Sequence, residues 1–253
     1  MVQREAGNIP EKSDKNNISA ETRKVLEIGV TVEIIERAIL LQARGKAKGP
    51  DSLAVEIFQS DPKYWATRLK DIFLNPPELH QLEDGRVAYI YKQKGETFAR
   101  TFYRPISVLN AAYKIWALAQ TLLMHHIIED VMSITQSGFR QKHGTQDALS
   151  WNQNVINRVQ EKLLSMGYLD MSKAFDEAIR KKIWERLIKI GCPKKWVAQI
   201  REGHINSHLR PSFEGAIGEK VKVDKGVYQG SPLSPILFII YSLLKDPLLR
   251  TNI

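Results

Sequence analysis

Two acidic residues that could bind a metal ion stand close together in the segment LDMSKAFD, as Asp170 and Asp176. The stretch from Gly167 to Met171 is short, apolar and begins at a glycine, which predicts a buried strand with Asp170 near its end. A carboxylate there suits Mg²⁺, because this hard cation prefers oxygen ligands and often takes only one or two protein carboxylates beside substrate phosphates. The alternative is that Asp170 or Ser172 caps the helix that follows.

A second candidate site is the segment YQGSPLSPILF, which starts at Tyr228. Gly230 allows a flat backbone on which a base and a sugar could lie, and the amide of Gln229 could hydrogen-bond to a nucleotide. The alternative is structural. Ser234 followed by Pro235 is a typical helix start, with an N-cap residue and then proline at the first helical position.

Basic residues form a third candidate site, in the neighbouring segments YKQKG and YRPIS. Lys92 supplies a point charge and Arg104 a planar fork of donors, and the pair suits a triphosphate. Lys94 is the alternative to Lys92. Basic side chains beside a turn are more commonly just solvated, so this segment alone does not decide between the two interpretations.

The elements that must position these segments follow from the spacing of apolar residues. Helical spacing begins at Thr31 and stops at Gly45, and it recurs over residues 65–73, 110–131 and 147–164. Further helices are expected from about 172 to 190 and from 234 to about 246, and strands over residues 87–91, 209–213 and 221–227, the last two paired. This irregular mixture of helices and strands predicts an α+β fold.

Composition narrows the class of protein. The 253 residues are 43% hydrophobic, which is enough for a sizeable core, and the net charge of +9 favours a polyanionic partner. Cys192 is the single cysteine, so we expect no internal disulfide and an intracellular protein, either nuclear or cytoplasmic. Residues 1–24 are expected to be a mobile polar leader, and no apolar stretch is long enough to span a membrane.

The order of these blocks resembles that of non-LTR retrotransposon (LINE-type) reverse transcriptases, and the resemblance runs through most of the chain. Two further blocks lie between the basic segments and the acidic one: QSGFR at residues 136–140 and GTQDA at 144–148. Upstream, residues 45–51 are similar to the Gly-Pro-Asp segment of the family, although Ser52 stands where glycine is usual. Any one of these blocks could occur by chance. We do not expect all of them to occur by chance in the order that the family has.

The resemblance implies a right-hand polymerase fold with the thumb absent. Residues 25–165 would form a fingers-like region with N-terminal helices, and residues 166–253 a partial palm. The implied activity is RNA-directed DNA synthesis, in which two Mg²⁺ ions, or Mn²⁺ in their place, activate the 3′ hydroxyl of a DNA primer on an RNA template. Deoxynucleoside triphosphates would be the substrates.

Individual site residues follow from their positions in the motifs. Asp170 resembles the first metal-binding carboxylate, and Met171 would offer its carbonyl to the metal. Phe175 is similar to the aromatic residue that excludes a ribose 2′ hydroxyl, while Asp176 is expected to be structural. The triphosphate would be held by Lys92 and Arg104, and the nucleotide and template would contact Gln229 and Gly230.

One motif of the family has no counterpart in the sequence. An aromatic residue, a variable residue and then Asp-Asp should follow the Gln229 segment by a few dozen residues, but the sequence runs to Ile253 without any Asp-Asp pair. Because Asp170 alone provides too little negative charge for two cations, we expect this chain to be inactive by itself. The alternative is a non-catalytic remnant that binds nucleic acid.

Overall fold

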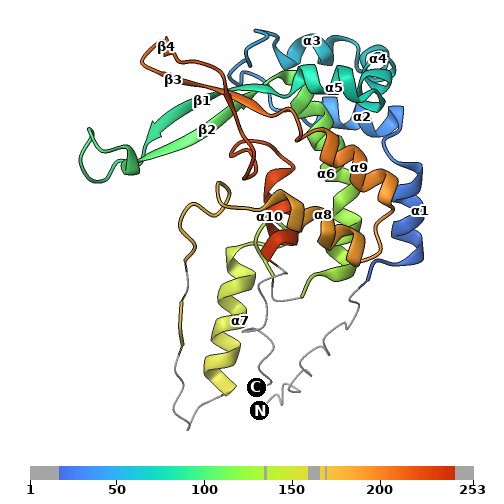
Figure 1. The fold of residues 1–253 in the computed structure, drawn as a ribbon. Helices are drawn as coiled ribbons and strands as arrows, with labels where there is room; N and C mark the ends of the chain where they lie inside the picture. Colours follow the sequence, from blue (N-terminus) through green and yellow to red (C-terminus); the bar gives the residue numbers. More distant parts are fainter. Residues whose placement is uncertain (1–16, 134–135, 159–165, 169, 243–253) are drawn as a thin grey trace.

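The computed structural model describes residues 17–133, 136–158, 166–168 and 170–242. It shows the predicted α+β fold, with one mixed sheet and with a hairpin of two strands that projects from a largely helical body (Figure 1). The helices are α1 (Ala20–Ile28), α2 (Val32–Leu40), α3 (Val55–Ser60), α4 (Pro62–Leu74), α5 (Pro76–Leu82), α6 (Ala111–Val131), α7 (Thr145–Arg158), α8 (Arg180–Lys189), α9 (Lys194–Glu202) and α10 (Ser234–Ser242). The strands are β1 (Asp84–Tyr91), β2 (Tyr103–Leu109), β3 (His208–Phe213), β4 (Ala216–Ile217) and β5 (Val221–Lys222), and a short 3₁₀ helix, η1 (Arg100–Phe102), precedes β2.

Helix α1 begins inside the segment that was predicted to be a mobile leader. The hydroxyl of Ser19 accepts a hydrogen bond from the backbone N–H of Thr22 at 3.1 Å, which caps the helix. Thr22 and Leu26 are buried, and α1 packs against α6 and α9. Residues 20–24 are therefore helical, and the part of the predicted leader before residue 17 lies outside the described residues.

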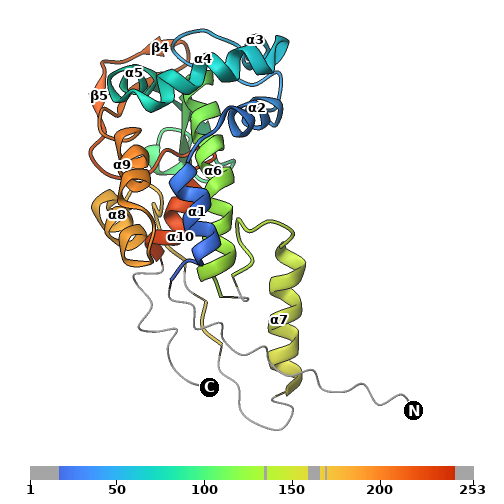
Figure 2. The same ribbon diagram turned by 90° about the vertical axis from the view of Figure 1, so that its right-hand side faces the viewer.

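Helix α6 is the centre of the core and matches the prediction for residues 110–131. It contacts α1, α2, α5 and α10, and buried residues occur around nearly its whole circumference (Figure 2). Trp116 is fully buried and packs so closely against Gly203 that a Cβ atom there would lie 2.1 Å from the indole ring. The N-terminal helices and the later elements α10 and Gly203 therefore pack against the same central helix.

The sheet has the order β2, β1, β3, β4, with β5 also paired to β3. Strands β1 and β2 are antiparallel, with Ile90 opposite Arg104, whereas β1 and β3 are parallel. The predicted pairing of the two later strands is confirmed by Leu209 opposite Val221, although β5 is shorter than expected. Strand β2 was not predicted, because Pro105 interrupts its pattern and proline is tolerated mainly in edge strands such as this one.

The buried strand predicted for Gly167 to Met171 is wrong for the part that the structure describes. Tyr168 is 80% exposed and Met171 is 50% exposed, and neither belongs to a strand. A buried strand needs a neighbouring strand for its backbone hydrogen bonds, and the described sheet includes no partner for this segment. Leu169 lies outside the described residues.

Two helices differ from prediction in length or packing. Residues 172–177 form turns, so the helix expected from about 172 begins only at Arg180. Helix α7 stands apart from the rest of the described chain in both ribbon views, and Leu149 and Val155 on it are exposed (Figures 1 and 2).

Among the described residues, no helix is long and apolar enough to cross a bilayer.

Candidate functional site

A pocket of about 550 Å³ opens between the hairpin of β1 and β2 and the turns at residues 173–177. It brings together four of the residues that were expected to contact a nucleotide, Lys92, Arg104, Phe175 and Gln229, and it also includes Asp176, which was expected to be structural. The other residues in its wall are Tyr89, Thr101, Tyr103, Pro105, Lys173, Ala174, Glu177 and Lys225. We call it the hairpin pocket.

The hairpin forms one wall of this pocket. The Lys92 side chain donates a hydrogen bond from Nζ to the carbonyl of Thr101 at 2.8 Å, and its backbone N–H donates to the carbonyl of Phe102 at 2.8 Å. Gly95 has a positive φ of 75°, and a Cβ atom there would lie 2.4 Å from the Phe102 ring, so the turn requires glycine. These contacts fix the strand end that carries Lys92 beside Arg104.

The opposite wall is held by backbone hydrogen bonds to the segment that leads to Gln229. The N–H of Val227 donates to the carbonyl of Phe175 at 2.9 Å, and the N–H of Gly226 donates to that of Ala178 at 2.8 Å. Gly226 has a φ of 79°, and a Cβ atom there would lie 2.9 Å from the Phe175 carbonyl oxygen. The backbone of residues 226–227 is thus bonded to the Phe175 turn, and this places Gln229, two residues further on, close to Phe175.

The turn at Gln229 and Gly230 is attached to strand β2. The N–H of Ser107 donates to the carbonyl of Gln229 at 2.7 Å. Gly230 has a φ of 129°, and a Cβ atom there would lie 2.6 Å from the Ser107 carbonyl oxygen. The sequence predicted that a base and a sugar could lie against the backbone at Gly230, and in the structure the group that lies against its α-carbon is the backbone of β2.

The charges that line the hairpin pocket are mainly positive. Lys92, Arg104, Lys173 and Lys225 are set against two carboxylates, those of Asp176 and Glu177. Lys225 donates a hydrogen bond to Glu177 at 2.8 Å and lowers the pKa of that carboxyl, while burial raises the pKa of Asp176 against the opposing effect of Lys173. The excess of positive over negative side chains in the wall of the pocket favours an anionic ligand.

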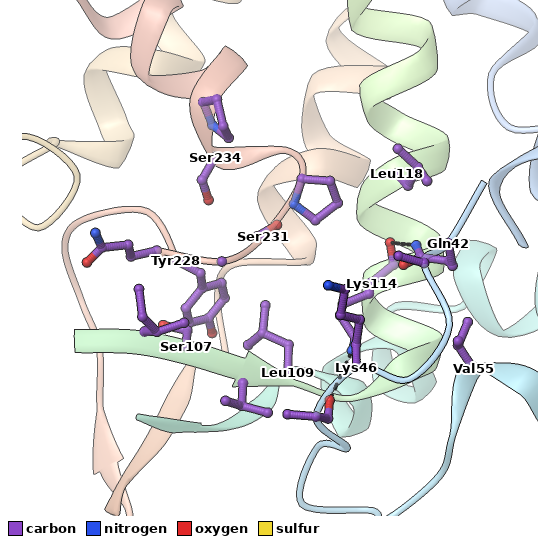
Figure 3. A pocket seen from close by; sticks show the side chains of 18 of the residues that line it. Gln42, Lys46, Val55, Ser107, Leu109, Lys114, Leu118, Tyr228, Ser231 and Ser234 are labelled. Carbon is purple, nitrogen blue, oxygen red and sulfur yellow. Dashed lines mark hydrogen bonds between the residues drawn. The ribbon is translucent and has the colours of Figure 1, made fainter. Parts of the chain in front are cut away.

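A second pocket, of about 650 Å³, lies beside the first and shares Phe175 and Gln229 with it. Gly230 lines this second pocket, which we call the α6 pocket, and not the hairpin pocket. Figure 3 shows it bounded by β2, α6 and the loop after α2, with the side chains of Lys46 and Lys114 among an otherwise largely apolar lining. Burial lowers the pKa of Lys114.

Asp170 and Met171 are both exposed and line neither pocket. The described residues contain no group of three or more His, Cys, Asp or Glu side chains that could hold a metal ion. Of the two carboxylates in the hairpin pocket, Glu177 is already paired with Lys225. The described part of the chain thus does not bring together a ligand set for two divalent cations.

Comparison with known proteins decides the family. The model of the family "Reverse transcriptase (RNA-dependent DNA polymerase)" matches residues 90–246, which is more than half of the chain. The chain belongs to the reverse transcriptase family. All four residues gathered in the hairpin pocket lie within the matched range, and the family generally uses divalent metal ions.

Individual relatives are proteins of retrotransposable elements and transposons, which confirms the resemblance to non-LTR retrotransposon reverse transcriptases. The chain is 30% identical over 209 residues to the Pol polyprotein of the type-2 retrotransposable element R2DM of Drosophila melanogaster, covering 80% of the chain and 19% of that protein. It is 24% identical over 240 residues to the 149 kDa protein of transposon TX1 of Xenopus laevis, covering 92% of the chain and 18% of that protein. A probable RNA-directed DNA polymerase from the transposon X-element of Drosophila melanogaster is 25% identical over 228 residues, with 82% of the chain and 24% of that protein covered. The chain therefore spans about a fifth of the length of these relatives.

This reverse transcriptase domain also contains a buried polar cluster that the sequence did not reveal. The guanidinium of Arg180 donates to the carbonyls of Gly226 and His204, both at 2.7 Å, and to the Ser207 hydroxyl at 3.2 Å. The same hydroxyl donates to the carboxylate of Glu83 at 3.3 Å. One signal was present: Arg180 occupies the buried stripe of α8 that continues through residues 183 and 187. The cluster is attached to the segment that leads to Gln229 through the hydrogen bond from Arg180 to the Gly226 carbonyl.

Proposed function

We propose that the hairpin pocket binds the incoming deoxynucleoside triphosphate of an RNA-directed DNA polymerase, and that the intact protein adds such nucleotides to a primer 3′ hydroxyl. The observation that carries this proposal is the convergence of Lys92, Arg104, Phe175 and Gln229 in one basic pocket. These residues come from segments that are far apart in the chain. If the basic side chains of the hairpin were only solvated, there would be no reason for Phe175 and Gln229 to lie opposite them.

Each of the four residues has a role that its chemistry supports. Lys92 and Arg104 hold the triphosphate, since an ammonium and a guanidinium donate charge-assisted hydrogen bonds to phosphate oxygens. Phe175 lies against the sugar and leaves no room for a 2′ hydroxyl, which favours deoxynucleotides. Gln229 contacts the nucleotide with its side-chain amide.

The α6 pocket is the place that we propose for the template base. It shares Phe175 and Gln229 with the hairpin pocket, so a base held there would lie next to the incoming nucleotide. Its lining is largely apolar and suits the flat faces of a base, whereas Lys46 and Lys114 suit the template phosphates. Gly230 lines this pocket and is the second residue that we propose contacts the template.

The metal ions of the reaction are Mg²⁺, two in number, with Mn²⁺ as the alternative, and Asp170 and the carbonyl of Met171 are their proposed ligands. Metal ions of this kind supply charge stabilisation to phosphoryl transfer. Because the described residues do not complete such a ligand set, we expect this chain alone to bind nucleotides without extending a primer. Binding of nucleic acid without catalysis is thus the second candidate for the present activity of the chain.

A nucleotide-binding measurement on the full chain tests the proposal. The affinity for a fluorescent deoxynucleoside triphosphate is compared between the wild type, the variant Lys92→Gln with Arg104→Gln, and a matched control, Arg210→Gln with Lys222→Gln. Both pairs remove two positive charges, and Arg210 and Lys222 are exposed and do not line the hairpin pocket. A charge-assisted hydrogen bond contributes about 1.5–3 kcal/mol, so we expect the first pair to weaken binding by roughly 100-fold or more.

The outcomes separate the possibilities. Equal affinities of the two paired variants would show that the hairpin pocket is not the nucleotide site, and absence of binding by the wild type would remove the proposal altogether. Primer extension on an RNA template is measured in parallel. Extension by the wild type that Asp170→Ala abolishes would replace the binding-only alternative with an active polymerase.

A further inference from the structure

Most of the net positive charge of the chain lies on α8 and α9 and not around the two pockets. Residues 180–202 contain eight Lys and Arg and two Glu, a net charge of +6, whereas the whole chain has a net charge of +9. Figure 1 shows these two helices on the side of the body away from the tip of the hairpin. Such a concentration of charge calls for its own explanation.

The two helices direct their apolar residues inward and their cations outward. Ile183, Leu187 and Trp196 are fully or almost fully buried. Arg180 is buried as well, and its charge is used inside the cluster around Glu83. The cations that remain exposed on these helices are Lys181, Lys182, Lys189, Lys194, Lys195 and Arg201. The outer surface of α8 and α9 is therefore basic even without the charge of the buried Arg180.

A groove of about 550 Å³ runs between α8 and α9. Lys181, Lys194 and Arg201 line it together with one acid, Glu185, and the half-buried Trp184 forms part of its wall. The Lys181 ammonium and the Glu185 carboxylate are 3.9 Å apart and both are largely exposed, so this pair neutralises little of the positive field. None of the groove residues lines the hairpin pocket or the α6 pocket.

We infer that the groove between α8 and α9 binds the phosphodiester backbone of a nucleic acid as a second contact outside the nucleotide and template pockets. Three cations from two helices can neutralise successive phosphates, and counterion release then drives association. The half-buried Trp184 in the wall of the groove adds an aromatic side chain that a sugar or a base could contact. Because the groove shares no residue with the proposed nucleotide site, this inference stands or falls separately from it.

The salt dependence of binding tests the inference quantitatively. Affinity for a 20-base-pair duplex DNA without sequence preference and for a single-stranded RNA of the same length is measured at several salt concentrations. Each phosphate contact contributes about −0.9 to the log-log slope on duplex DNA and about −0.7 on a single strand. The variant Lys181→Gln, Lys194→Gln, Arg201→Gln should therefore lower the magnitude of the slope by about 2.7 on the duplex or about 2 on the single strand.

A matched control removes the same charge elsewhere. Arg37, Lys63 and Arg68 are exposed on α2 and α4, and their replacement by glutamine should leave the slope nearly unchanged. Thermal melting verifies that both triple variants fold, and affinity for a deoxynucleoside triphosphate should be equal in both. Equal loss of slope in the two triple variants would show an effect of net charge alone and would refute the inference, as would an unchanged slope in the groove variant. The probe that shows the larger change identifies the strand type that the groove accepts.

Discussion

Glu83 should make the stability of this domain depend on pH in the neutral range. Its side chain is fully buried at the end of α5, and burial raises the pKa of the carboxyl from 4.5 to about 8 against the opposing hydrogen bond from Ser207. Arg180 also faces the carboxyl and lowers the pKa, and Glu202 raises it. His80 lies 4.0 Å from it. The folded protein therefore holds a proton that the unfolded chain releases.

The direction of the effect follows from that difference. Glu83 contributes stability that is fully present below pH 4.5 and is lost as the pH rises to about 8, because the unfolded carboxylate ionises first. His204 acts in the opposite direction, since burial lowers the pKa of its imidazole from 6.5 to about 3 and its contribution is lost as the pH falls through that range. At pH 6.5 the unfolded imidazole is still half protonated, so the His204 contribution changes by only about 0.4 kcal/mol between pH 6.5 and 8. In this interval the change at Glu83 is the larger one and has the opposite sign.

The expected size of the effect is about 2 kcal/mol, because each pH unit in this interval changes the free energy of unfolding by about 1.36 kcal/mol for one proton. For a domain of this length that corresponds to a melting temperature lower by about 4–8 °C at pH 8 than at pH 6.5. Urea unfolding followed by tryptophan fluorescence at both pH values measures the free energy directly. Glu83→Gln should abolish the decrease at pH 8, and Glu185→Gln, a change at an exposed residue, should preserve it. A decrease that persists in Glu83→Gln would refute the reasoning.

Two further substitutions test the packing behind the pockets. Gly230→Ala should destabilise the domain by about 1–3 kcal/mol, because alanine would have to adopt a φ of 129° and would meet the Ser107 carbonyl, whereas Gly144→Ala, at an open position, should change the urea midpoint little. Arg180→Met should cost about 3–5 kcal/mol in a thermal melt, because the buried carbonyls of Gly226 and His204 would lose their hydrogen-bond donor. A loss below about 1 kcal/mol would show that these hydrogen bonds do not hold the cluster together.

Much of the helical architecture could be predicted from the sequence because apolar residues recur at helical spacing. Helix α6 matches its predicted range closely, and α2 and α4 lie where the pattern placed them. Helix α1 was missed, since its residues are polar except for a narrow buried stripe. The strand predicted near Asp170 was wrong because an apolar pattern cannot show whether a pairing partner exists.

The candidate site was predictable mainly through the order of the motifs. Local spacing could not show that Lys92, Arg104, Phe175 and Gln229 meet in one pocket, because their convergence depends on hydrogen bonds between distant segments. The resemblance to a known family supplied that information. The location of Gly230 in the α6 pocket depends on the packing of two backbones, which a sequence pattern does not reveal.

The hydrogen bond from Ser107 to Gln229 has a consequence for how the protein is made. During translation the chain emerges from the ribosome in order, so β2 must wait until the segment with Gln229 has also left the exit tunnel before this contact can form. Until then, the edge of β2 is free to pair with other strands and the hairpin pocket has only one wall. Completion of the pocket therefore comes after the synthesis of β2, and protection of the Ser107 amide from hydrogen exchange would report it.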